Sequence, residues 1–133
     1  SKEMGVRKIL NFGHTFAHAF EATLGFSKKL NHGEAVILGI KTAAKFSLFK
    51  KILDIKEFKI IENHLNKFDL PRNINKLITR KNISKILSFM KKDKKNNTNK
   101  INLVLLKKIG TPTYKLQFNE EDINKFLLKE LVK

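Results

Sequence analysis

Three of the four histidines in this 133-residue chain lie close together, at His14, His18 and His32. The first two belong to the stretch RKILNFGHTFAHAFE, and the third follows shortly afterwards in HGEAV. Neutral imidazoles bind Zn²⁺ well, and a catalytic zinc usually takes about three protein ligands with an open position for substrate. The cluster therefore indicates a metal site. Spacing alone allows His14 with His18 as the ligand pair as readily as either of them with His32.

A polar stripe follows one face of the first predicted helix. Residues three, four and seven apart share a helix face, which groups Arg7, Asn11, His14 and His18. Such side chains can bind anions, hydroxyls or a metal, whereas an ordinary solvent-facing stripe carries Lys and Glu. The alternative is a pair of surface histidines that coincide by chance. A third histidine after a glycine-containing loop weakens that alternative, because the loop can fold His32 back against the first helix.

The elements that must position these residues are mainly helices. Hydrophobic spacing and cap residues predict helices at residues 5–24, 34–49, 54–68, 74–79, 82–92 and 119–132. The caps are Asp54, Asn82 and Asn119. Two runs rich in β-formers, residues 101–106 and 113–118, predict a hairpin. With no internal repeat and no linker, the fold class is mainly α: one helical domain with one small β-hairpin.

Composition limits the chemistry that the chain can perform. Without cysteine, any metal must be held by histidine nitrogen and carboxylate oxygen. A net charge of +16 is compatible with nucleic-acid binding, but the lysines are spread over the whole length, which favours a solvated surface. The densest run, KKDKKNNTNK at residues 91–100, is a candidate anion contact. No apolar run has the length of a membrane span, and we expect a cytoplasmic protein without a membrane partner.

The two histidine segments resemble the signature region of the 3-dehydroquinate synthase family, which runs close to R-x-x-L-N-x-G-H-T-F-G-H-A-x-E, a short loop and H-G-E-A-V. EMGVR, MKKDKK and INLVLLKKIG extend the resemblance over nearly the whole chain. Residues 1–133 then correspond to the helical C-terminal domain, a fragment of a two-domain α/β plus α enzyme whose N-terminal NAD-binding domain is absent from this chain. Ala17 replaces the family's frequent glycine, and the loop before His32 is one or two residues longer.

The resemblance implies a role for each matching residue. His14 and His32 correspond to the metal ligands, with a third ligand, a glutamate, in the preceding half of the enzyme. His18 corresponds to a catalytic histidine that contacts substrate and helps proton movement. The implied substrate-binding residues are Glu3, Arg7, Asn11 and Lys94, with Lys95 as the alternative to Lys94.

The implied reaction converts 3-deoxy-arabino-heptulosonate 7-phosphate, a phosphorylated sugar acid, to 3-dehydroquinate and phosphate in the shikimate pathway. The enzyme would be a carbon–oxygen lyase of aromatic amino acid biosynthesis, a homodimer when full-length, using NAD and a divalent metal, zinc or cobalt. This chain alone should be inactive, because it lacks the NAD site and one metal ligand. The alternatives are another sugar-phosphate cyclase, a metal-dependent polyol dehydrogenase and a basic nucleic-acid-binding helical module. The last leaves the histidine cluster unexplained.

Overall fold

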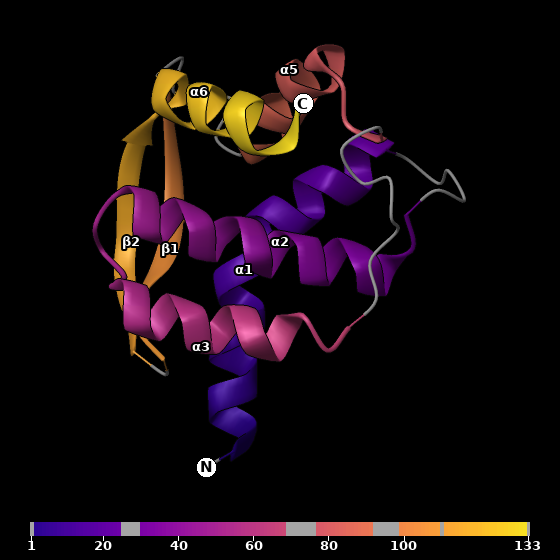
Figure 1. Ribbon diagram of the computed structural model, residues 1–133. Coiled ribbons are helices and arrows are strands. Elements are labelled where there is room, and N and C mark those ends of the chain that lie inside the picture. The colour runs from indigo at the N-terminus through magenta and orange to yellow at the C-terminus, as the bar shows by residue number, and fades with distance from the viewer. Residues whose placement is uncertain (1, 25–29, 69–76, 92–98, 110, 133) are drawn as a thin grey trace.

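The computed structural model describes residues 2–24, 30–68, 77–91, 99–109 and 111–132 (Figure 1). In these residues the elements are α1 (Lys2–Leu24), α2 (His32–Phe49), α3 (Ile55–Leu65), α5 (Arg80–Met90), β1 (Lys100–Lys108), β2 (Thr111–Asn119) and α6 (Glu120–Leu131). β1 and β2 form an antiparallel two-stranded sheet. The predicted class, mainly helical with one hairpin, is confirmed. Within the described part of the chain, no helix is long and apolar enough to cross a membrane.

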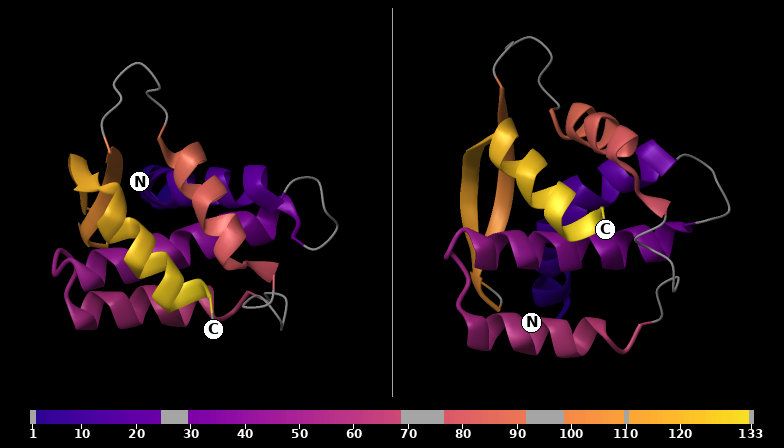
Figure 2. Two further views of the ribbon diagram at one scale, coloured as in Figure 1. Left: turned by 90° about the horizontal axis from the view of Figure 1, so that it is seen from above. Right: turned by 45° about the horizontal axis from the view of Figure 1, so that its top comes forward.

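α2 runs through the middle of the molecule; α1 and α3 pack directly against it, and α5 packs against α1. α1 crosses α2 and shares its most extensive packing, while α3 lies along α2 on another side (Figures 1 and 2). The hairpin stands at one end of α1 and α2, and α5 and α6 pack against each other. The α1–α2 pair is therefore the frame on which the histidines are carried.

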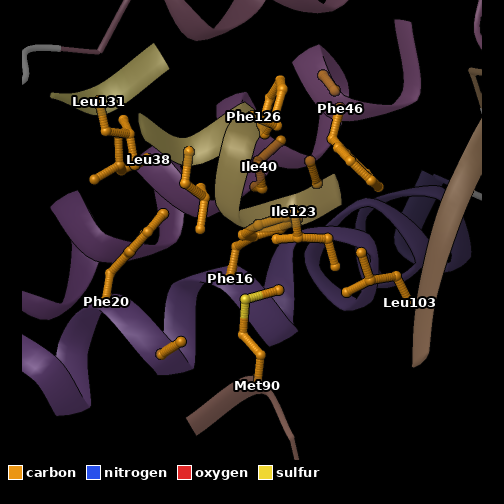
Figure 3. Packing of buried hydrophobic residues seen from close by; sticks show 14 of the residues in the cluster. Phe16, Phe20, Leu38, Ile40, Phe46, Met90, Leu103, Ile123, Phe126 and Leu131 are labelled. Carbon is orange, nitrogen blue, oxygen red and sulfur yellow. The ribbon is translucent and has the colours of Figure 1, made fainter. Parts of the chain in front are cut away.

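Aromatic packing at the centre of the core fixes this frame (Figure 3). Phe46 on α2 is fully buried. Its ring meets Phe16 of α1 edge-on at a centroid distance of 6.3 Å, and meets Phe118 and Phe126 at 5.1 Å each. These edge-to-face contacts are a favoured geometry for aromatic rings. One side chain thus joins α1, α2, β2 and α6.

The two long helices cross at glycines. A Cβ built on Gly13 would lie 2.6 Å from the Cγ1 of Ile40, and one built on Gly39 would lie 2.6 Å from the Cβ of Ala17. Neither position has space for a side chain. Ala17, which stands where the family often has glycine, is therefore accommodated by Gly39 on the facing helix. Since Gly13 directly precedes His14, this close crossing sets the distance from the histidine-bearing face of α1 to α2.

Three helix starts differ from their predicted positions. α1 begins at Lys2, three residues before the predicted Gly5. α2 begins at His32 rather than Glu34, because Asn31 accepts the N–H of Glu34 and donates its own N–H to the Glu34 carboxylate. α5 begins at Arg80, with Thr79 as its cap. Asn82, predicted as the cap, instead lies three residues inside and accepts the N–H of Thr79 at 2.9 Å.

The other caps were predicted correctly. Asp54 accepts the N–H of Glu57 at 2.9 Å and begins α3, which ends at Leu65, before the predicted Phe68. Asn119 precedes α6. Of the short helix predicted at 74–79, residues 74–76 lie outside the described residues; Leu77 is helical, and Ile78 and Thr79 are not.

Candidate functional site

His14 and His18 lie side by side on the exposed face of α1. Their rings are nearly parallel, with an interplanar angle of 15° and centroids 6.1 Å apart. The four-residue spacing on a helix makes the two side chains neighbours. The opposite face carries Phe12, Phe16 and Phe20, which are buried. Burial of this phenylalanine face turns the imidazoles outward, so the predicted polar stripe is confirmed for the two histidines.

His32 is brought to the same place by the start of α2. The Asn31–Glu34 capping box holds the helix entry through bonds of 2.8 and 2.9 Å, so the backbone of His32 is fixed at the first helical position. The prediction that the loop returns His32 to the first helix is confirmed by the hollow that the three histidines share.

This hollow has a volume of about 260 Å³ and lies between α1 and the first turn of α2. Its lining consists of His14, Ala17, His18, Glu21, His32, Ala35 and Val36. The polar members are three imidazoles and one carboxylate. An apolar floor with a few convergent polar groups is the usual composition of a small-molecule site.

Glu21 is a member of this site that the sequence analysis missed. Its Oε2 lies 2.5 Å from Nδ1 of His32. The signal was present, because Glu21 is three residues beyond His18 and seven beyond His14, and so continues the same helix stripe. Only the position of α2 shows that the carboxylate meets the third histidine.

Comparison with known proteins gives the family. A family model described as "3-dehydroquinate synthase C-terminal" matches residues 1–96. The chain belongs to this family. The resemblance identified from the histidine segments is therefore confirmed.

Two curated relatives illustrate the match. The 3-dehydroquinate synthase of Pelagibacter ubique (strain HTCC1062) is 71% identical over 132 residues, which cover 99% of this chain and 36% of the relative. That of Colwellia psychrerythraea (strain 34H / ATCC BAA-681) is 37% identical over 131 residues, covering 98% and 34%. The chain thus spans about a third of the length of the 3-dehydroquinate synthases it matches.

Solved structures support the fold. A 2-deoxy-scyllo-inosose synthase complexed with carbaglucose-6-phosphate, NAD⁺ and Co²⁺ superposes with a TM-score of 0.70 at 20% identity, over 90% of this chain and 32% of that chain. A second structure of a 2-deoxy-scyllo-inosose synthase has a TM-score of 0.67 at 19% identity, over 90% and 31% of the two chains. At this identity the likeness establishes a shared architecture only.

The structure describes the residues predicted to bind substrate only in part. The helix that carries His14, α1, also carries Glu3, Arg7 and Asn11, but the structure describes only the backbone of these three residues. Lys94 and Lys95 fall in residues 92–98, which are also outside it. The roles of these residues remain predictions.

The donor set of the hollow suits a divalent metal but is incomplete. Imidazole nitrogen is a good ligand for Zn²⁺ and Co²⁺. Among residues 2–24, 30–68, 77–91, 99–109 and 111–132, however, no three histidine or acidic side chains are grouped closely enough to hold an ion. A metal bound at these histidines would need a ligand from beyond the described residues.

Proposed function

We propose that this chain is the metal- and substrate-binding part of a 3-dehydroquinate synthase, a carbon–oxygen lyase. The whole enzyme would convert 3-deoxy-arabino-heptulosonate 7-phosphate to 3-dehydroquinate and phosphate with NAD. One observation carries the proposal: His14, His18 and His32 line a single hollow at the junction of two helices. The identity of 71% to an enzyme of that name supports this reaction over that of another cyclase.

His14 and His32 would hold the divalent metal, zinc or cobalt, together with a glutamate from outside this chain. When bound, the metal acidifies the substrate hydroxyl that NAD oxidises and polarises the resulting ketone. His18 lines the same hollow one helical turn from His14, so its ring nitrogen is available to exchange a proton with the substrate. Of the two imidazoles on α1, His14 would then bind the metal and His18 would exchange the proton.

The polar stripe on α1 would bind the rest of the substrate. Arg7 and Asn11 are seven and three residues before His14, on the same helix face. A guanidinium pairs well with the substrate carboxylate, and an amide suits a hydroxyl or phosphate oxygen. Glu3 extends the stripe, and Lys94 would contact the phosphate. Such anchors at both ends of a substrate hold its reacting atoms in place.

The remaining part of the proposal concerns the protein beyond this chain. We infer an N-terminal NAD-binding domain, because the chain spans only about a third of its relatives. Residues 1–133 then form the C-terminal helical domain. We also propose a cytoplasmic homodimer that binds a phosphorylated sugar acid and has no nucleic-acid or membrane partner.

A chimera tests this function directly. This chain would replace the matching 132 residues of the Pelagibacter ubique relative, to which it is 71% identical. We expect the chimera to release phosphate from the substrate with NAD⁺ and Zn²⁺ at a rate typical of enzymes, about 1 s⁻¹ or faster. The chain expressed alone is the control and should release none. Turnover by the chain alone would contradict the two-domain proposal.

The same assay separates the synthase from a polyol dehydrogenase. In the synthase reaction the hydride returns to the substrate, so phosphate accumulates without a matching rise in NADH absorbance. A dehydrogenase would accumulate NADH in proportion to product and release no phosphate. A chimera that binds metal but gives neither phosphate nor NADH would refute the assignment of this chain to the reaction.

A further inference from the structure

Glu21 and His32 form a contact that connects the end of α1 with the start of α2. The residues are 11 positions apart, and Oε2 of Glu21 lies 2.5 Å from Nδ1 of His32. A carboxylate is only an acceptor, so Nδ1 must be the nitrogen that carries the proton. The lone pair of the imidazole is then on Nε2.

The contact contributes little to the stability of the fold. The side chain of His32 is 80% exposed and that of Glu21 is 44% exposed, so water screens their interaction. The capping box of Asn31 and Glu34 already fixes the backbone of His32. What the backbone cannot fix is the rotation of the imidazole and the choice of protonated nitrogen, and the carboxylate determines both.

We propose that Glu21 is a positioning residue for His32: its carboxylate holds the ring in the Nδ1–H tautomer and leaves Nε2 as the nitrogen that binds the metal. The proposal rests on the proposed function, in which His32 is a ligand. A carboxylate behind a ligating histidine restricts the orientation of the ring and fixes its tautomer. Both effects strengthen binding without contact between Glu21 and the metal.

The position of Glu21 on the helix supports this role. It follows His18 by three residues and His14 by seven, so α1 presents two imidazoles and the carboxylate on one face, toward the third imidazole on α2. Glu21 thus lies beside the histidines of the first helix and contacts the histidine of the second. Loss of the carboxylate would free the His32 ring while leaving both helices intact.

The test measures Zn²⁺ affinity of the chimera, with and without substitutions, by competition with a chelator. Glu21→Ala should weaken binding by about 10- to 100-fold, the usual cost of losing a group that supports a metal ligand. Glu21→Gln, which keeps an acceptor for Nδ1–H, should recover part of that loss. Glu121→Gln removes the same charge from an exposed site on α6 and should leave the affinity unchanged. Circular dichroism checks that each variant folds.

Two further measurements decide between outcomes. In a His32→Ala background, Glu21→Ala should have no additional effect, because Glu21 acts through His32. In the metal-free protein, ¹H–¹⁵N NMR should show His32 protonated on Nδ1, and Glu21→Ala should shift it toward the Nε2–H tautomer. An additional loss in the His32→Ala background would make Glu21 a ligand itself and overturn the positioning role.

Failure of this inference is distinguishable from failure of the proposed function. If Glu21→Ala binds Zn²⁺ normally while His14→Ala and His32→Ala do not, the metal site stands and the positioning role is wrong. If neither histidine substitution changes Zn²⁺ affinity, the proposed metal site itself is wrong, and the role of Glu21 is refuted with it.

Discussion

Substitution of Gly39 by alanine should destabilise the α1–α2 crossing, although alanine normally favours a helix. The added Cβ would lie 2.6 Å from both the Cβ and the backbone N of Ala17, and 2.7 Å from the carbonyl oxygen of Gly13. Ordinary contact begins at 3.4 Å, so the shortest contacts are too close by 3.4 − 2.6 = 0.8 Å. Two of the three neighbours are backbone atoms, so the helices themselves must move apart.

The expected loss follows from two opposing terms. Overpacking a core lowers the free energy of unfolding by about 1–3 kcal/mol. A clash with backbone atoms should cost near the upper end of this range, because backbone cannot move aside as a side chain can. Replacing a helical glycine by alanine gains about 1 kcal/mol. The free energy of unfolding should therefore fall by about 2 kcal/mol for Gly39→Ala. At about 4 °C per kcal/mol for a chain of this size, Tm should fall by about 8 °C.

A second glycine on the same helix provides the control. A Cβ on Gly33 would meet only the Oδ1 of Asn31, at 3.5 Å, an ordinary contact. Gly33→Ala should therefore leave stability unchanged or raise it by up to about 1 kcal/mol. Thermal and urea unfolding followed by circular dichroism measure both variants. If Gly39→Ala is as stable as Gly33→Ala, the close crossing is not a feature of the folded chain.

Ala17→Gly distinguishes a side-chain clash from a backbone clash. It removes the Cβ of Ala17, but the backbone N of residue 17 and the carbonyl of Gly13 remain within 2.7 Å of the new methyl group. The double variant Ala17→Gly, Gly39→Ala should therefore stay less stable than the wild type. Full recovery would mean that the contact is with the methyl group of Ala17 alone, and would refute the requirement for helix movement.

Two further predictions concern the site itself, tested in the chimera. His14→Ala and His32→Ala should each lower zinc content, while His18→Ala should keep the metal and mainly reduce turnover; loss of zinc in His18→Ala with retention in His32→Ala would reverse the ligand assignment. Lys94→Ala should lower kcat/KM about ten- to hundredfold, because a charge-assisted bond to phosphate is worth roughly 1.5–3 kcal/mol. Lys51→Ala, an exposed control, should change kcat/KM little, and equal effects in both would remove Lys94 from the site.

The helices were predictable where apolar spacing is regular, and their starts were predictable only where a single cap candidate precedes the helix. Asp54 and Asn119 are single candidates before their helices, and both were identified correctly. Thr79 and Asn82 are both good cap residues three positions apart, so sequence alone could not choose between them. In the structure Asn82 supports the cap from inside the helix. α2 starts two residues before the predicted Glu34 because Asn31 and Glu34 form a capping box, in which Glu34 lies inside the first turn.

The sequence predicts which site residues share a face of one helix, but not which residues of two helices come into contact. His14 and His18 share a face because of their four-residue spacing, and helix geometry alone gives that result. Glu21 lies on the same face, but its significance depends on His32, which belongs to a different helix. The separation of α1 and α2 depends on two glycines whose closeness no periodicity reveals. The hollow therefore depends on how α1 and α2 cross, and the hydrophobic pattern of the sequence does not predict that crossing.

Exposure of the site groups supports the view that this chain supplies one side of an active site. Catalysis of this kind needs a water-excluded pocket, because hydride transfer and elimination compete with solvent. In the part of the chain that the structure describes, the side chain of His32 is 80% exposed and that of Glu21 is 44% exposed. Ala17 and Ala35, which line the same hollow, are buried, so the exposure belongs to the polar side chains. For the proposed reaction these groups would have to be shielded from water, and the NAD-binding domain proposed above would provide the covering surface together with the third metal ligand.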